Sequence, residues 1–373
     1  MKMKKSVSMY LMVAFILTSC GGSGTEAISG GRLKNSALPS TTLQPTSDIA
    51  AGFNGANQDF RGQSFMFRDL RGSDFRNANL EGASFWGAKI ENANFSGANL
   101  FRADMSLALM SNTNFTDANL READFFNGVE GANFTRADLT FADLMGCNIS
   151  GTNFTGAILN HSDMAYTHGL ANFSGASMLS TQAKLMNSQG SNFQGAFLRN
   201  TLFHGVNLSN ANFEKAFMEE VRFNNLDHTA PSNLTNANFF QANLVRADLA
   251  NAIITGANLE AAQLSDATLE GLNLSGRKFE NLDLQHTSFY GSNMTGTSFM
   301  GSRLMHADMR YANLTNANLT LVNLDNGMLD NSVLNGAKLP GASINGTWIR
   351  FIKDKGTQWP KYCKRYQKKC ANW

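Results

Sequence analysis

Large apolar residues recur every five positions along most of the chain. From Leu234 to Ile349 the period runs without a slip, through residues such as Phe239, Leu244 and Leu249. Two residues before most of them lies a small residue, usually Ala, and Asn or Asp usually stands between the two. A period of five fits neither an α-helix, which repeats every 3.6 residues, nor a β-strand, which repeats every two. It predicts a chain that turns a corner every five residues, so that four sides make a coil of about 20 residues.

Such coils are expected to stack about 4.8 Å apart, as paired β-strands do. The large residue and the small residue two positions earlier would point inward and fill a narrow core, while the other residues face water. Breaks in the period then predict irregular corners. They fall at a four-residue step before Val129, at residues 166–171, at residues 179–191, where two registers compete, and at residues 224–233, where we expect a bulging corner.

The repeat resembles that of a known family. Residues 237–239, 242–244 and 247–249 read Ala-Asn-Phe, Ala-Asn-Leu and Ala-Asp-Leu, and these triplets are similar to the A(N/D)LXX pattern of the pentapeptide-repeat family. The resemblance covers roughly residues 56 to 349. It implies an all-β fold, the right-handed quadrilateral β-helix, for a solenoid that we place at residues 51–349.

The N-terminus resembles the signal peptide of a bacterial lipoprotein. Lys2, Lys4 and Lys5 precede an apolar stretch, Val7–Leu17, which is too short to span a bilayer as a mature helix. Residues 17–20 read Leu-Thr-Ser-Cys and resemble a lipobox, which would make Cys20 the lipidated first residue of the mature chain. An ordinary signal peptide with a chance cysteine is the alternative.

A signal peptide at residues 1–19 would be followed by a flexible tether at residues 20–50, which is rich in Gly, Ser, Thr and Pro. The expected location is the bacterial cell envelope, with membrane lipid as the partner of the acyl anchor. Gly21, rather than Asp, after the lipidated cysteine resembles the pattern of outer-membrane lipoproteins.

The remaining cysteines fit an exported protein. Cys147 occupies the small inward position before Ile149 and is expected to be buried and inert. Cys363 and Cys370 lie in the segment after the repeats, where an oxidising compartment would favour a disulfide between them. Two unpaired thiols are the alternative.

The C-terminal segment, residues 350–373, is expected to cap the open end of the stack. It carries eight Lys and Arg residues against one acidic residue, whereas residues 51–349 carry 18 basic and 26 acidic residues. Some pentapeptide-repeat proteins imitate DNA and bind DNA gyrase. Because duplex DNA carries about one charge per 1.7 Å, a net charge of −8 is far too small for such mimicry. Gyrase binding is therefore only a remote alternative, and we expect no nucleic-acid partner.

No residue pattern indicates catalysis. The six His residues form no cluster with metal-ligand spacing, and no phosphate loop or nucleophile motif is found. His286 and His306 fall at equivalent positions of adjacent coils and should stack. We therefore expect a protein that is not an enzyme, with no catalytic residue, no metal and no cofactor.

One outward face of the last six coils carries small hydroxyl and amide groups in register. Such a ladder could bind a periodic ligand, a glycan polymer or ice, but stacked Thr and Asn also stabilise a sheet without any ligand. The candidate ladder residues are Thr235, Thr255, Ser275, Thr295 and Thr315 with Asn273, Asn293 and Asn313.

Apolar residues also follow the core positions of four coils near the start of the solenoid. They are expected to lie together on one face, either as a docking patch or covered by apolar residues such as Ile49 and Phe53. The candidate patch consists of Met66, Phe67, Trp86, Leu107 and Phe126.

One coil departs from the repeat, because Leu272, Arg277 and Leu282 occupy small inward positions. A buried Arg is costly without a partner, so we expect either a local widening or an Arg277 side chain turned out to solvent. Taken together, the sequence predicts a non-catalytic, membrane-anchored scaffold that interacts with an unidentified envelope or extracellular protein or polymer. The alternatives are a binder of a repetitive ligand and, more remotely, an enzyme built on the corner loops.

Overall fold

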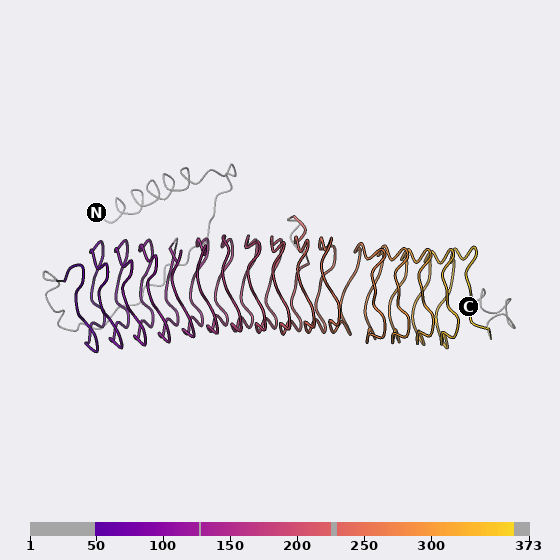
Figure 1. Ribbon diagram of the computed structural model, residues 1–373, viewed down its shortest axis with the longest axis horizontal. Coiled ribbons are helices and arrows are strands. Elements are labelled where there is room, and N and C mark those ends of the chain that lie inside the picture. The colour runs from indigo at the N-terminus through magenta and orange to yellow at the C-terminus, as the bar shows by residue number, and fades with distance from the viewer. Residues whose placement is uncertain (1–48, 127, 225–229, 362–373) are drawn as a thin grey trace, which may run out of the picture. The chain divides into compact units, whose positions relative to one another are not determined.

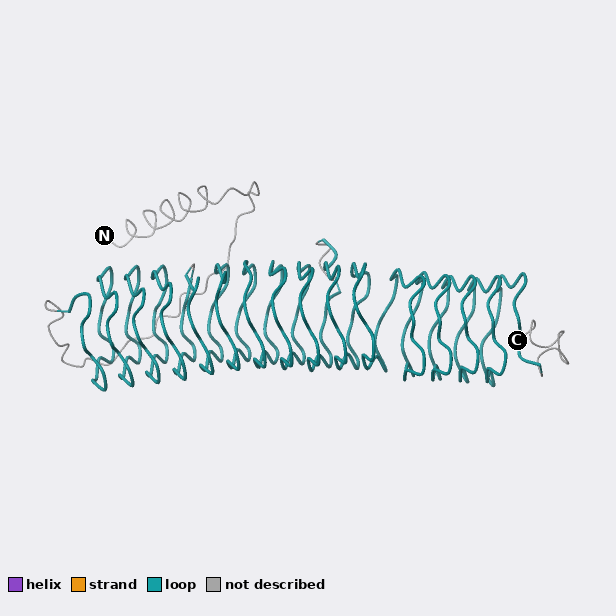
Figure 2. Ribbon diagram, viewed as in Figure 1, coloured by secondary structure: helices purple, strands orange, loops and turns teal. Residues whose placement is uncertain are grey.

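The computed structural model describes residues 49–126, 128–224 and 230–361 (Figure 1). Within these ranges it contains neither a helix nor a continuous strand, so no such element has bounds to report. Regularly spaced turns and single-residue β-bridges replace them (Figure 2). No helix in the described ranges is long and apolar enough to cross a membrane.

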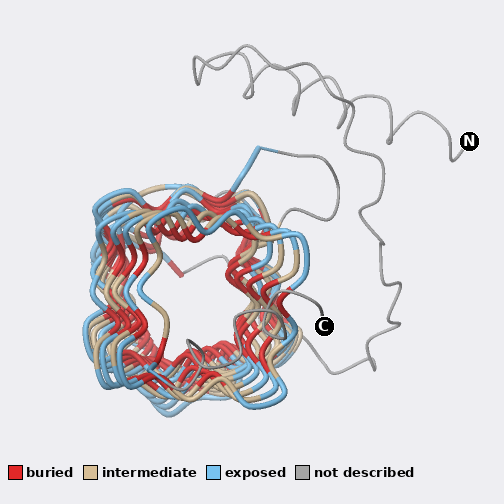
Figure 3. Ribbon diagram, turned by 90° about the vertical axis from the view of Figure 1, so that its right-hand side faces the viewer, coloured by how far each residue is buried: buried red, intermediate tan, exposed pale blue. Residues whose placement is uncertain are grey.

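The bridges confirm the coil length that the period predicts. Asn54 pairs in parallel with Asp74, and Asn99 pairs with Asn119. Through the last repeats the same spacing holds, for example between Asn293 and Asn313. Viewed along the stack, the described coils form a four-sided outline with buried residues toward the inside (Figure 3). The chain is an all-β solenoid, as the sequence predicted.

The regular corners of the described coils are tight turns with one left-handed residue. At one corner the amide of Gln63 donates to the carbonyl of Phe60 at 3.0 Å, and Gly62 has φ of +65°. Non-glycine residues occupy this position too, such as Phe67 with φ of +58°. Among the described residues, none with positive φ is β-branched, because branching at Cβ disfavours the left-handed region.

The core consists of columns of large side chains, one column for each side of the coil. One column contains Phe on nine successive coils, and the rings stack face to face with centroids 4.7 to 5.2 Å apart. This spacing is that of the coils themselves, so the rings pack without a gap. The column comprises Phe75, Phe95, Phe115, Phe134, Phe154, Phe173, Phe193, Phe213 and Phe239.

The small inward positions accept Ala, Ser, Thr and Cys. Most Thr hydroxyls at this position donate to a carbonyl of the preceding coil, as Thr113 does to Ile90 and Thr152 does to Val129, both at 2.7 Å, whereas Thr167 donates to Met164 of its own coil at 2.9 Å. These buried hydroxyls are therefore satisfied. Cys147 is buried, as predicted, and its Sγ donates to the carbonyl of Phe125 at 3.0 Å.

The breaks in the period correspond to changes in coil length. Some coils are one residue shorter than the rest, as the bridges between Asn114 and Asn133 and between Asn153 and Asn172 show. Another coil is six residues longer, because Asn207 pairs with Asn233 across an insertion at one corner. The expected bulging corner at residues 224–233 is confirmed by this spacing; residues 225–229 lie outside the described part of the chain.

The competing registers of residues 179–191 are resolved by an exchange of volumes. Ala183 occupies a large inward position, and Met186 follows in the next small position. Ser188 occupies the next large position above Gly169, which replaces a core side chain on the preceding coil. The Ser188 hydroxyl donates to the Gly169 carbonyl at 2.6 Å. Met186 therefore fits because the large positions beside it hold small residues.

The two ends of the stack differ from the prediction in detail. Ile49 is buried, and Phe53 packs edge-on against Phe60 at 5.9 Å, so both residues close the first end of the core. At the other end, coil pairing continues to Lys353 and Gln358, beyond the predicted boundary at residue 349. Only residues 350–361 of the predicted cap are described.

The coil with three oversize residues departs from the regular stack locally, because on three of its four sides it does not pair with the preceding coil. The Arg277 side chain does not turn out to solvent, so that alternative is wrong. Its guanidinium is partly buried and donates to the carbonyls of Ala257 and Ile254, both at 2.6 Å. Burial lowers the pKa of Arg277 from its usual range.

Candidate binding surfaces of the solenoid

The Thr/Asn ladder lies on one face, but the structure divides it. Asn293 donates to Asn273 at 3.1 Å across adjacent coils. No bridge joins Ile253 and Asn273 within the described chain. Thr235 and Thr255 are thus separated from Ser275, Thr295 and Thr315 by an interruption of the sheet.

Three hydroxyls of the ladder are already engaged. Thr295 donates to Asn293 at 2.8 Å, and Thr315 donates to Asn313 at 2.7 Å. Ser275 donates to Asn273 in the same way. These bonds fix the hydroxyl protons within each coil and leave oxygen lone pairs toward solvent, which is how such a ladder stabilises a sheet without a ligand.

A second and longer polar ladder was missed by the sequence analysis. It lies on the outside of the Phe column, where each Asn directly precedes a core residue. The side-chain amides form an unbroken chain, with each Nδ2 donating to the Oδ1 of the preceding coil at 3.0 to 3.4 Å. Asn ladders of this kind stabilise stacked in-register strands. The ladder comprises Asn94, Asn114, Asn133, Asn153, Asn172, Asn192, Asn212, Asn238 and Asn258.

The predicted apolar patch near the N-terminal end lies at one corner of successive coils. The amide of Phe67 donates to the carbonyl of Trp86, and that of Leu107 donates to the carbonyl of Phe126. Phe67 and Trp86 touch edge-on at 4.7 Å. Phe67 is 67% exposed and Met66 45% exposed. Because Ile49 and Phe53 pack into the end of the core, neither side chain covers this patch.

A second apolar surface, here called the middle patch, lies on another face. It consists of Phe141, Ile158, Leu179, Phe197 and Phe217, all of which are exposed. Ile158, Phe197 and Phe217 stand at outward positions where the repeat normally places Asn or Asp. Phe197 and Phe217 stack with their rings 4.9 Å apart. Ser177 lies between Ile158 and Phe197 on this face. A face that carries several exposed apolar residues is typical of an interaction site.

Four carboxylates stack on a further face, at Asp104, Asp124, Asp143 and Asp163. Burial raises the pKa of Asp124, and the charges of Asp143 and Asp104 add to the rise. Burial likewise raises the pKa of Asp143, and Asp163 adds to it. Because a raised pKa in the folded state means that the charge opposes folding, the protonated carboxyls contribute stability at low pH. That contribution is lost as the pH rises through the raised pKa values.

Several surface carboxylates are compensated by local ion pairs. Asp69 pairs with Arg71 at 2.6 Å, and Asp74 pairs with Arg76 at 2.7 Å. The hydrogen bond from Arg71 lowers the pKa of Asp69 to about 2. A surface that pairs its acids with arginines lacks the unbroken negative charge of a DNA backbone.

The described residues form no metal-binding cluster. His286 and His306 stack as expected, with ring centroids 4.7 Å apart. In the described ranges no group of three or more His, Cys, Asp or Glu side chains could hold a metal ion. Cys20, Cys363 and Cys370 lie outside the described residues, so the lipidation and the disulfide stay predictions.

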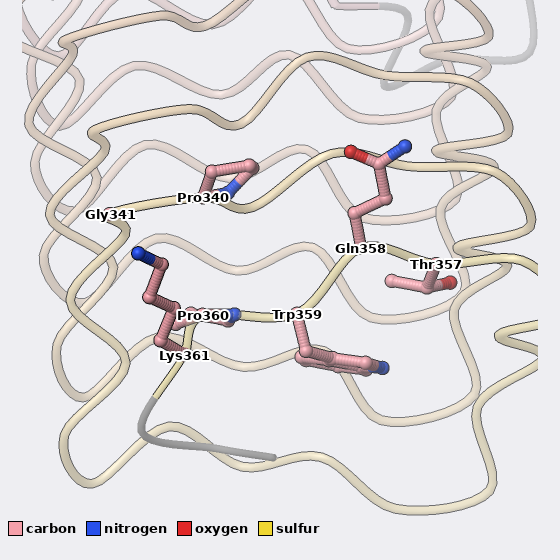
Figure 4. A pocket seen from close by; sticks show the side chains of 7 residues that line it. All are labelled: Pro340, Gly341, Thr357, Gln358, Trp359, Pro360 and Lys361. Atoms are coloured by element: carbon pink, nitrogen blue, oxygen red, sulfur yellow. The ribbon is translucent and has the colours of Figure 1, made fainter.

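A cavity of about 560 Å³ lies at the C-terminal end of the described chain (Figure 4). Lys361 is the one charged side chain among its lining residues, which offer no pair of titratable groups for acid-base chemistry. It is lined by Pro340, Gly341, Thr357, Gln358, Trp359, Pro360 and Lys361.

Comparison with known proteins gives a consistent result. The family model "Pentapeptide repeats (8 copies)" matches more than half of the chain. The matched segments are residues 69–106, 98–127, 130–165, 189–225, 232–271, 271–304, 283–320, 301–326 and 317–350. A search of curated proteins found no match.

Solved pentapeptide-repeat structures are similar to parts of the chain. HetL from Nostoc sp., involved in heterocyst differentiation regulation, is 24% identical, with 58% of this chain and 89% of that chain covered and a TM-score of 0.27. A pentapeptide repeat protein from the Arabidopsis thaliana thylakoid lumen is 36% identical, with 26% and 72% covered and a TM-score of 0.20. QnrB1, a plasmid-mediated fluoroquinolone resistance protein, is 18% identical, with 58% and 91% covered and a TM-score of 0.26. With its repeats matched over most of its length, the chain belongs to the pentapeptide-repeat family.

Proposed function

We propose that this protein is a non-catalytic scaffold of the bacterial envelope, a right-handed quadrilateral β-helix held at a membrane by lipid on Cys20. The scaffold role is inferred from the different uses of inward and outward side chains. Inward side chains of the described coils are used for packing, and outward positions carry exposed apolar groups, among them those of the apolar patch near the N-terminal end and of the middle patch. A surface of this kind binds partners through shape and apolar area.

The middle patch gives this proposal its strongest support. An outward position in this repeat holds Asn or Asp in most coils, because the side-chain oxygen accepts an amide hydrogen bond from the following corner, as Asn153 does from Thr155. At Ile158, Phe197 and Phe217 that bond is given up in favour of apolar surface. Exposed apolar side chains at these positions are expected if a binding partner covers them.

Anchoring rests on the sequence of the N-terminus. A lysine-rich start, a short apolar stretch and a cysteine after Leu17-Thr18-Ser19 fit lipid attachment at Cys20, with residues 20–50 as the tether. We propose an outer-membrane location and an envelope or extracellular protein or polymer as the partner. A disulfide between Cys363 and Cys370 fits the same compartment.

Two alternatives receive less support. A binder of glycan polymer or ice would need a continuous ladder, whereas pairing is interrupted between Thr255 and Ser275. Gyrase binding by imitation of DNA would need dense unpaired negative charge, whereas Asp69 and Asp74 are neutralised by neighbouring arginines.

Labelled palmitate tests the anchor. We expect the full chain, expressed in an enteric bacterium, to take up the label and to sediment with membranes, and we expect Cys20→Ser to do neither. Cys147→Ser is the matched control, because Cys147 is buried and its replacement should leave labelling intact. A soluble, unlabelled chain that keeps its N-terminal segment uncleaved would overturn the proposal of a lipid-anchored scaffold.

A further inference from the structure

At one junction of the described chain, near its C-terminal third, pairing between coils is lost on three of the four sides, whereas beside Gly128 it is lost on one side only. Between the coil that contains Ile254 and the coil that contains Leu274, Thr268 pairs with Ser288. On the other three sides the described residues form no bridge, although pairing is present on all four sides of the next junction. Figure 1 shows a wider interval between coils in this part of the solenoid. The unpaired positions are 253 with 273, 258 with 278, and 263 with 283.

Backbone hydrogen bonds are missing at the same three sides. In the neighbouring junctions, Leu234 donates to Ile253 and Leu274 donates to Asn293, both at 2.8 Å. The equivalent amides of Ile254, Leu259 and Leu264 have no such bond to the next coil in the described structure. Unpaired backbone groups at an open sheet edge must be satisfied by water.

The cause lies in the size of three inward residues. Small-position side chains lean toward the preceding coil, as the hydrogen bond from Thr287 to the Leu264 carbonyl shows. Large core residues follow Leu272, Arg277 and Leu282 in the chain. These core residues fill their own positions and leave no room for the oversize side chains. The three sides that lack pairing are those with an oversize residue, and the fourth side, with Thr287, keeps its bridge.

Met186 shows that size alone does not open a junction. It also occupies a small position, yet His168 still pairs with Asn187 beside it. Ser188 and Gly169 hold the large positions there and make room for the Met side chain. Overpacking separates the coils when this compensation is absent.

Arg277 also connects the two separated coils. The carbonyl of Ala257 would accept the amide of Lys278 if the repeat continued, as Ala237 accepts the amide of Asn258 at 2.8 Å. The Arg277 guanidinium donates a hydrogen bond to that carbonyl instead, and a second one to the carbonyl of Ile254. Charge-assisted hydrogen bonds of this kind are stronger than the neutral bonds that they replace.

We propose that this junction is a hinge, with the Thr268–Ser288 pairing as its axis and Arg277 as its latch. The solenoid then consists of two stiff segments, one before and one after the junction, that can change their mutual angle. The long Asn ladder ends at Asn258, directly before the hinge, so its stiffening effect is confined to the first segment. Oversize residues hold the hinge open, and the guanidinium limits how far it opens.

Amide hydrogen exchange on the full-length protein tests the hinge. In the unmodified chain, the amides of Ile254, Leu259 and Leu264 should exchange faster than those of Leu234, Phe239 and Leu244 by about tenfold or more. Equal protection of the two sets would overturn the proposal, and this comparison needs no variant.

Two variants separate the effect of the oversize side chains from the effect of the Arg277 hydrogen bonds. The triple change Leu272→Ala, Arg277→Ala and Leu282→Ala should let the coils pair and slow exchange to the level of neighbouring junctions. Arg277→Met keeps the bulk but removes the two hydrogen bonds, so exchange should become faster still. Thr297→Ala, in the equivalent small position of the next coil, is the control and should leave these amides unchanged. Unaltered exchange in both the triple variant and Arg277→Met would contradict the roles assigned to the three residues.

Discussion

Replacing Phe154 with Ala is expected to lower the free energy of unfolding by about 3–5 kcal/mol. Phe154 is fully buried, and its ring stacks between Phe134 at 5.2 Å and Phe173 at 5.0 Å. Backbone pairing above and below fixes the coil spacing, so the neighbouring rings cannot move together to fill the space. The cavity therefore persists and its cost adds to the lost burial. Urea-induced unfolding followed by circular dichroism measures the loss.

Phe154→Leu is the matched control. A Leu already ends the same column at position 259, directly above Phe239, so the coil accepts that side chain. The expected loss is less than about 1.5 kcal/mol, as for other swaps that nearly conserve volume. An Ala variant as stable as the Leu variant would mean that the rings are not tightly stacked.

Enlarging a small inward residue should open a junction where none exists. Ala157 is fully buried, and its neighbour Ile158 pairs with Asp138 on the preceding coil. Ala157→Leu recreates the arrangement at Leu272, with a full-size core residue, Leu159, beside it. We expect a loss of about 1–3 kcal/mol in the free energy of unfolding. Faster amide exchange at Leu139 and Ile158 should accompany it.

Ala157→Ser provides the comparison for this prediction. Thr152 and Ser292 occupy small positions elsewhere and donate to a carbonyl of the preceding coil. The Ser variant should therefore stay close to the unmodified protein in both measurements. If the Leu variant is equally unaffected, the size of the small residue does not control coil pairing, and the explanation of the open junction is wrong.

The fold could be predicted from the sequence in those regions where each five-residue unit contains its own large and small inward residue. The run from Leu234 to Ile349 shows this, because every corner is specified locally. Residues 179–191 could not be assigned, because Ala183 and Met186 exchange roles and the match depends on Gly169 in the preceding coil. Volume there is conserved across coils, which the order of residues along the chain does not reveal.

The surfaces were harder to predict than the core. Sorting outward residues by face requires the length of each coil, and that length is not constant, because some coils are shortened and one carries an insertion. The middle patch joins Ile158, Phe197 and Phe217 across one such shortened coil, so these residues share no constant spacing. The Asn ladder did leave a signal, the repeated Asn-Phe pairs such as Asn153-Phe154 and Asn192-Phe193. Their alignment required the shortened coils to be located first.

Disulfide trapping tests the four-sided stack of coils most directly. Asn99 and Asn119 pair on adjacent coils, and their side chains hydrogen-bond at 2.8 Å. Paired strands lie about 4.8 Å apart, within the reach of a disulfide. Cysteines placed at both positions of the full chain should therefore cross-link on oxidation, as peptide mass mapping would show. Cysteines at Asn99 and Asn114, on different sides of the coil, should not. Cross-linking of the second pair without the first would contradict the coil length and register on which the whole account depends.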